Sequence, residues 1–243
     1  TVCSLLEWTG WKVTREYYFN NAGNQMQNLA VTVRERYRAV FGVEENEDNL
    51  HYAGDYIREI ARGIADEHGD AKIDADLDFF RSAGESWCFA RIRATLDRLQ
   101  IRHDVFYNED SLYKEGKIDA VLADLREKDL AYDEDGAVWL RTTSFGADKD
   151  RVIVKSTGEP TYRLPDIAYH KEKILRGFDR IIDIFGADHI ATIPDVLAAV
   201  QSFGLATDHV DVIINQMVSF VNEGETVKMS KRSGNVYSLD YLI

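Results

Sequence analysis

The feature that most constrains the fold is an alternation of strand and helix patterns near the end of the chain. Apolar residues run almost continuously over 181–185 and again over 210–218, and a helical pattern covers 194–203 between them. Apolar strands that alternate with helices predict an α/β fold with a parallel sheet buried on both faces. Because ligands bind beyond the carboxyl ends of such strands, we expect the functional site in segments 186–189 and 216–218.

The beginning of the chain follows the same α/β scheme. Residues 1–10 carry a helix pattern, residues 12–19 alternate as a strand, and residues 25–40 carry a second helix pattern;. Since no strand precedes the first helix, this segment corresponds to a βαβα unit whose first strand is missing.

The middle of the chain has a different character. Helical periodicity covers 52–67, 77–99 and 118–128, with a short strand at 105–107, and short strands return at 138–140 and 152–154 before a helix that follows Pro165;. We predict the first half of an incomplete core at 1–43, a mainly helical insertion at 44–135, and the second half of the core at 136–243.

The charge balance limits the kinds of partner. The 243 residues carry a formal charge of −13, and segment 44–78 holds twelve carboxylates against three basic residues. A surface that grips nucleic acid over its whole extent is excluded, because phosphate contacts need clustered Lys and Arg. The rest of the chain is only mildly acidic, so local binding of RNA or a nucleotide is permitted.

Several features favour a cytoplasmic protein. No apolar stretch is long enough to cross a bilayer, and residues 1–10 lack the basic start and the cleavage site of a signal peptide;. Cys3 and Cys88 lie far apart in apolar settings, which predicts reduced, buried thiols. The sequence shows no spacing typical of metal ligands.

A mobile catalytic loop is predicted near the end of the chain by the string Lys228-Met229-Ser230-Lys231-Arg232-Ser233-Gly234-Asn235. Two ammonium groups on a backbone rich in N–H donors suit a polyphosphate leaving group. A solvated basic turn is the alternative, since lysines are usually exposed.

This string is similar to the KMSKS signature of class I aminoacyl-tRNA synthetases, in a KMSKR form. Four further motifs resemble arginyl-tRNA synthetases: REYYFNNAGNQ at 15–25, FGADKDRV at 145–152, TYRLPDIAYH at 161–170 and GADH at 186–189. The resemblance covers nearly the whole chain, in the right order. It implies a Rossmann-type parallel sheet, with its first strand absent, that carries a largely helical insertion.

The resemblance implies an arginine site. In the family, the residues matching Tyr162 and Asp166 contact the substrate side chain, and the residue matching Asp188 helps to hold it. A guanidinium is planar and always charged, so a pairing carboxylate and an aromatic or hydroxyl group suit this ligand. The alternatives are a helix first-turn carboxylate for Asp166 and a half-buried strand residue for Tyr162.

The resemblance also implies an ATP site. Gly186 would permit close approach of ribose or phosphate, and the strand end would lie against the adenine. The alternatives are a structural histidine and, at the strand end, simple core packing. The predicted ATP-binding residues are Gly186, His189, Met217, Val218, Lys228, Ser230 and Lys231.

The implied reaction joins arginine to tRNA. The arginine carboxylate would attack the α-phosphate of ATP, which arrives with Mg2+, and the arginyl-adenylate would transfer its arginine to the 3′-terminal adenosine of tRNA(Arg). Lys228 and Lys231 would be catalytic, because they meet the negative charge that builds on the leaving pyrophosphate.

The chain departs from the family pattern at its ends and at Asn21, where the family usually has Asp. It contains neither the first strand nor the HIGH signature of class I synthetases, and it stops before any anticodon-binding domain. We therefore expect an excised catalytic core with a distorted or strand-supplemented sheet, self-association, and no activity of this polypeptide alone. A non-catalytic module that binds ATP, arginine or the tRNA acceptor end is the alternative. Another class I specificity is disfavoured by Tyr162, Asp166 and segment 20–25.

Overall fold

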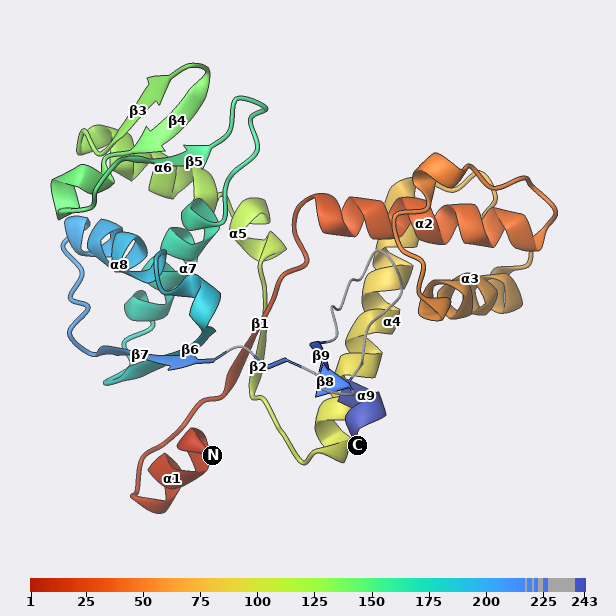
Figure 1. Cartoon of the computed structure of the whole chain (residues 1–243), viewed down its shortest axis with the longest axis horizontal. Coiled ribbons are helices and arrows are strands. Elements are labelled where there is room, and N and C mark those ends of the chain that lie inside the picture. Colours follow the sequence, from red (N-terminus) through yellow and green to blue (C-terminus); the bar gives the residue numbers. More distant parts are fainter. Residues whose placement is uncertain (217, 220, 223–224, 227–238) are drawn as a thin grey trace. The chain divides into compact units, whose positions relative to one another are not determined.

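A computed structural model describes residues 1–216, 218–219, 221–222, 225–226 and 239–243 of the chain (Figure 1). The chain divides into two compact units. The first comprises Thr1–Asn108 with the described part of Phe220–Ile243, and the second comprises Glu109–Ser219.

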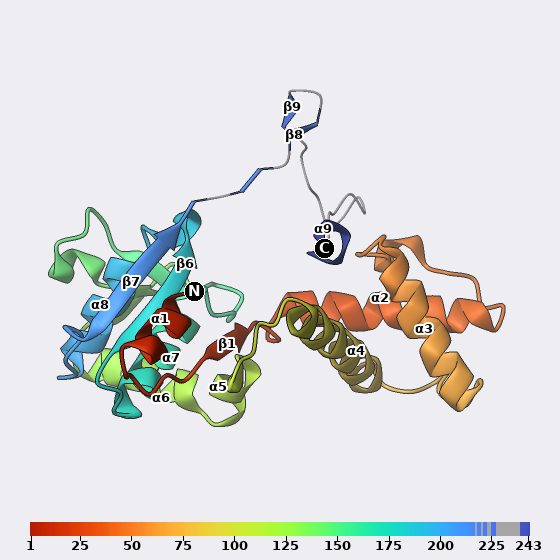
Figure 2. The ribbon, with the colours of Figure 1, turned by 90° about the horizontal axis from the view of Figure 1, so that it is seen from below.

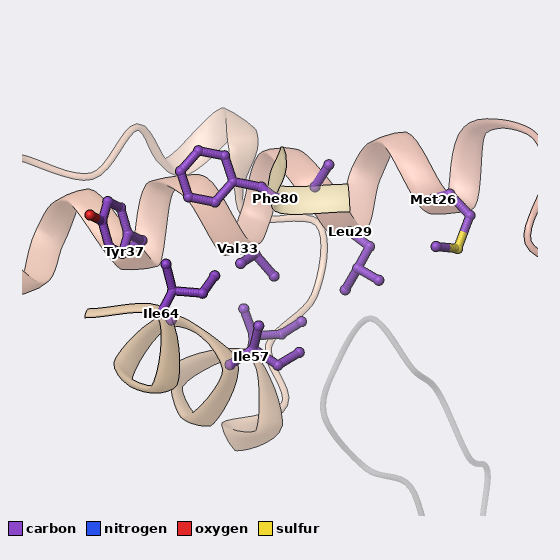
Figure 3. Packing of buried hydrophobic residues seen from close by; sticks show 10 residues of the cluster. Met26, Leu29, Val33, Tyr37, Ile57, Ile64 and Phe80 are labelled. Atoms are coloured by element: carbon purple, nitrogen blue, oxygen red, sulfur yellow. The ribbon is translucent and has the colours of Figure 1, made fainter. Parts of the chain in front are cut away.

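Three helices build the core of the first unit: α2 (Asn24–Val40), α3 (Asp55–His68) and α4 (Leu77–Arg98). Apolar residues recur every three or four positions along α2, so they share the face that meets α3 and α4;. Figure 3 shows the side chains of α2 and α3 pointing toward one another. The buried cluster consists of Met26, Leu29, Ala30, Val33, Tyr37, Ile57, Ile60, Ala61, Ile64 and Phe80. The helix patterns at 25–40, 52–67 and 77–99 are confirmed.

A parallel strand pair also belongs to the first unit. β1 (Glu16–Phe19) pairs with β2 (Val105–Asn108), and the rings of Tyr18 and Tyr107 stack across the pair. The prediction of a strand over 12–19 is correct only for its second half, since β1 begins at Glu16, and the backbone N–H of Arg15 donates to the Asp104 carboxylate at 2.7 Å.

The remaining described elements of the first unit are short. α1 (Val2–Trp8) confirms the helix expected at the start, and in the described structure none of its residues is buried. The others are η1 (Glu47–Asn49), β8 (Val221–Asn222), β9 (Glu225–Thr226) and α9 (Leu239–Leu242).

The second unit has three layers (Figure 1). An antiparallel sheet forms one layer, with β4 (Ala137–Leu140) between β3 (Ala131–Glu134) and β5 (Arg151–Val154). The middle layer consists of α6 (Lys117–Glu127), α7 (Arg163–Leu175) and α8 (Ile193–Ser202). The parallel strands β6 (Ile181–Gly186) and β7 (Val210–Asn215) form the third layer. Shorter helices are α5 (Asp110–Lys114), η2 (Thr142–Phe145) and η3 (Ala187–His189).

The parallel pairing of β6 and β7 confirms the alternation found in the sequence. The two strands lie side by side from Ile181 opposite Val210 to Gly186 opposite Asn215 (Figure 2). Both therefore end at the same edge, which is where ligands bind in parallel sheets.

The expectation that these strands are buried on both faces is wrong for the described residues. Side chains alternate along a strand, so Asp183 and Phe185 face α7, where both contact His170;. Ile184 points the other way and is 53% exposed, and Ile213 opposite it on β7 is 36% exposed. Among the described elements of this unit, helices thus cover only one face of the strand pair.

Several other sequence-based expectations meet the structure here. Cys3 and Cys88 are free, as expected, but both are half-buried rather than buried: Cys88 packs at the edge of the core cluster, and Cys3 lies on α1, none of whose residues is buried. Among the described helices, none combines the length and apolar character needed to cross a bilayer. The domain boundaries at 43/44 and 135/136, the supplemented sheet and the self-association stay predictions.

Candidate active site at the ends of the parallel strands

The start of α7 carries two of the three residues predicted to bind arginine, Tyr162 and Asp166. Pro165 is tolerated there because the first-turn N–H groups have no partner within a helix, and Asp166 is favoured by the helix dipole;. The backbone N–H of Asp166 donates to the carbonyl of Tyr162 at 3.1 Å, which closes the turn. Tyr162 precedes the helix and is 69% exposed, so it is not a half-buried strand residue. Tyr162 and Asp166 are four positions apart, which is the spacing at which positions on a helix share a face.

The carboxylate of Asp166 sits in an environment that favours a cationic partner. Burial raises its pKa, and the positive charges of His170, His189 and Lys173 act in the opposite direction. Desolvation penalises the ionised form of a carboxylate unless a cation compensates it. A bound guanidinium would supply that compensation.

A buried ionic cluster ties α7 to β6 next to this turn. Nδ1 of His170 lies 2.7 Å from the carbonyl oxygen of Asp166, and Nε2 lies 3.1 Å from Oδ2 of Asp183. Lys173 donates to the other oxygen of Asp183. Burial alone would raise the pKa of Asp183, but the hydrogen bond from His170 and the charge of Lys173 together lower it to about 2. Asp183 is therefore an ionised anchor for the helix that carries Asp166.

The turn after β6 holds three further predicted residues. Gly186 ends the strand with φ −71°, which any residue adopts. Its backbone conformation therefore does not require glycine, and only the close approach of a ligand would. Asp188 and His189 follow in η3, and their carboxylate and Nε2 atoms lie 3.8 Å apart. The His189 ring stacks on Phe185 with centroids 5.2 Å apart. The charge of His189 is one of those that act to lower the pKa of Asp166, against the effect of burial.

The segment after β7 is described only in part. Val218 is 78% exposed, so core packing does not explain this residue. Met217, Lys228, Ser230 and Lys231 lie outside the described residues, and their roles stay predictions.

Sequence reasoning did not single out Asp183, His170 or Lys173. One signal was present, because Asp183 interrupts an apolar strand, and a carboxylate in such a position needs a partner;. Its partners could not be predicted, because they lie on α7 and the sequence pattern does not show how that helix packs against the strand.

Asn21 has a structural role in the first unit. It is 1% exposed, its Nδ2 donates to Oε1 of Glu85 at 2.7 Å, and its carbonyl accepts from Arg81. An amide can donate to a carboxylate, whereas an Asp at this position would oppose Glu85 with a like charge. Segment 20–25 therefore includes more than a turn and a helix cap.

Known proteins with this architecture define its class. The structure of a Campylobacter jejuni protein assigned as an arginyl-tRNA synthetase aligns with a TM-score of 0.77 and 32% identity, covering 93% of this chain and 50% of that one. An arginyl-tRNA synthetase from Thermus thermophilus aligns with a TM-score of 0.60 at 17% identity, covering 98% and 46%, which supports the fold alone. The fold is that of a class I synthetase, with parallel strands and a Rossmann-type core, as the resemblance implied.

The sequence comparisons are more specific. The arginine–tRNA ligases of Desulfotalea psychrophila and Salinibacter ruber are 49% and 50% identical over 244 and 260 residues. They cover all of this chain, which spans 44% and 46% of their lengths. The family model for tRNA synthetases class I (R), catalytic domain, matches residues 1–243. The chain belongs to this family.

Proposed function

We propose that the protein containing this chain activates arginine with ATP and transfers it to tRNA(Arg). The observation that carries the proposal is the start of α7, where half-buried Asp166 follows exposed Tyr162 on the helix that His170 and Lys173 tie to β6. The family and the two ligases support the same reaction. Specificity for arginine rests on Asp166, because a carboxylate forms bidentate hydrogen bonds with a guanidinium and pairs with it better than with any neutral ligand side chain.

Each residue has a distinct role in binding arginine. Asp166 accepts hydrogen bonds from the guanidinium, and the ring or hydroxyl of Tyr162 fixes its plane. Asp188 is exposed in the turn after β6 and supplies a second carboxylate that helps to hold the arginine substrate. His170, Lys173 and Asp183 do not contact the ligand in this proposal; they hold α7 against β6.

ATP binds along the edge formed by the strand ends. Gly186 and His189 lie beside the ribose and phosphates, and Met217 and Val218 lie against the adenine. Lys228, Ser230 and Lys231 contact the phosphates from the KMSKR loop. Mg2+ comes with the phosphates of ATP, since it commonly binds through substrate phosphates and a few carboxylates. Within the described ranges no three or more His, Cys, Asp and Glu side chains gather to hold a metal by themselves.

The reaction needs positioning and charge stabilisation rather than a protein nucleophile. An oxygen of the arginine carboxylate bonds to the α-phosphorus, and the bond to the bridging oxygen of pyrophosphate breaks. Lys228 and Lys231 stabilise the charge on that leaving group. A hydroxyl of the 3′-terminal adenosine then attacks the arginyl carbonyl, and AMP leaves. A cytoplasmic location is proposed with this activity, and the free thiols of Cys3 and Cys88 suit a reducing compartment;.

Aminoacylation of unfractionated tRNA by the full-length protein tests the proposal. We expect arginine to be attached and lysine to be rejected, because lysine carries a compact ammonium instead of a planar guanidinium. Charging with an amino acid other than arginine would contradict the assigned specificity.

A further inference from the structure

Asp195 is a buried carboxylate that the proposed reaction does not use. It lies in the first turn of α8, and its side chain is 9% exposed. Its Oδ2 atom is 3.2 Å from Nε of Arg163 and 3.9 Å from Nε of Arg151. The carboxylate thus faces two guanidiniums, one from the start of α7 and one from β5.

The position of Arg163 explains why this contact matters. Arg163 is the first residue of α7, and Asp166 follows three residues later in the same helix. Side chains three residues apart on a helix are neighbours, with about 5–6 Å between Cβ atoms. The guanidinium of Arg163 is also the same chemical group as the side chain of the proposed substrate.

Without the carboxylate of Asp195, two electrostatic effects would favour movement of the Arg163 side chain. A cation at the amino end of a helix opposes the helix dipole, and Arg163 would also face the guanidinium of Arg151 without the carboxylate that separates their charges. Asp166 offers a carboxylate one turn along α7 whose burial makes a cationic partner favourable. The side chain of Arg163 could therefore occupy the place of the ligand.

We infer that Asp195 is a positioning residue that holds Arg163 away from Asp166 and so keeps Asp166 available to an arginine ligand. This inference rests on the proposed function. Arg151 is held independently by Asp148, whose Oδ1 lies 2.7 Å from Nη2 of Arg151, so Asp195 can serve chiefly as the partner of Arg163.

Binding of radiolabelled arginine to the full-length protein, measured by equilibrium dialysis, tests the inference. If released Arg163 occupied Asp166 in about nine of ten molecules, Asp195→Ala would raise the apparent Kd for arginine about tenfold. The Kd for ATP should not change. Asp195→Asn, which keeps the shape and one neutral acceptor, should raise the Kd for arginine by less.

The double variant Asp195→Ala/Arg163→Ala separates competition from simple loosening of the fold. If Arg163 competes with the ligand, removing it should return the Kd for arginine to within about twofold of the wild type. If Asp195 only stabilises the packing of α7 on α8, the double variant should bind arginine no better than Asp195→Ala, and the inference is overturned. Should Asp195→Ala fail to fold, Asp195→Asn with and without Arg163→Ala gives the same comparison.

Two controls keep the outcomes apart. Asp211→Ala removes the partner of Arg180 in an exposed ion pair across β6 and β7 and should leave arginine binding unchanged. Asp166→Asn tests the proposed site itself. If Asp166→Asn weakens arginine binding and Asp195→Ala does not, the inference fails and the proposed function stands. If Asp166→Asn has no effect, the arginine site is misassigned and the inference falls with it.

Discussion

Nε2 of His170 on α7 lies 3.1 Å from Oδ2 of Asp183 on β6; His170 is buried, and the side chain of Asp183 is 11% exposed. The same carboxylate also pairs with Lys173, one turn further along α7. The helix that presents Asp166 is thus fixed to the strand whose end forms the candidate site. Within this described cluster, the carboxylate of Asp183 pairs with two basic groups, those of His170 and Lys173.

Replacing Asp183 should therefore destabilise the fold strongly. Asp183→Asn removes the carboxylate that pairs with buried Lys173 and His170, and loss of one member of a buried pair costs about 3–5 kcal/mol;. Urea unfolding of the variant and the wild type measures the difference. Asp211→Asn, which removes a carboxylate from an exposed pair, is the matched control and should change the free energy of unfolding little;. Similar losses in the two variants would show that the cluster is not an anchor.

The stability that Asp183 provides should depend on pH in one direction. Its pKa falls from the ordinary value of 3.8 to about 2 in the folded protein, so its contribution is complete above the unfolded value and is lost as the pH falls toward the folded one;. We expect the gap in unfolding free energy between the wild type and Asp183→Asn to narrow as the pH is lowered from about 6 to about 2. A gap that stays constant over this range would contradict the lowered pKa.

The hydroxyl of Tyr37 should support the core of the first unit. It donates to the carbonyl of Gly69 at 2.6 Å and accepts from the backbone N–H of Lys72 at 3.1 Å. Tyr37→Phe keeps the ring and leaves both backbone groups without this partner, which should cost about 1–3 kcal/mol. Thermal unfolding measures the loss. An unchanged midpoint would mean that water replaces the hydroxyl.

The KMSKR loop should act on the reaction rather than on the binding of arginine. By analogy with the loss of one preorganised donor, Lys228→Ala or Lys231→Ala should raise the barrier to adenylate formation by about 3 kcal/mol. The Kd for arginine should stay near that of the wild type. Single-turnover formation of adenylate at the wild-type rate in both variants would remove these lysines from the catalytic set.

Local patterns in the sequence predicted most of the elements. The helices at 25–40 and 77–99 carry apolar residues at helical spacing, and the strands predicted at 181–185 and 210–218 are largely β-branched and apolar, although β7 ends at Asn215. β3 was missed because Tyr132, Asp133 and Glu134 give no clear alternation; its partner β4 decides its conformation.

The candidate site was predictable only as a list of positions. The motifs named Tyr162, Asp166 and His189, but the cluster around Asp183 and the pairing of Asp195 with Arg163 join residues on different elements. Such contacts depend on how α7 packs against β6 and α8, and periodicity does not specify that packing. The exposed face at Ile184 was missed for the same reason, since an apolar strand looks alike whether one face or two are covered.

We propose that Asp166 recognises the arginine that is activated with ATP. Arginine-dependent exchange of pyrophosphate into ATP by the full-length protein, with tRNA present, tests it most directly in the wild type and in Asp166→Asn. Loss of one charge-assisted hydrogen bond costs about 1.5–3 kcal/mol, so we predict that exchange in Asp166→Asn requires about ten- to a hundredfold more arginine while its ATP dependence is unchanged. Exchange that needs no arginine in the wild type, or the same arginine dependence in both proteins, would show that Asp166 does not recognise arginine.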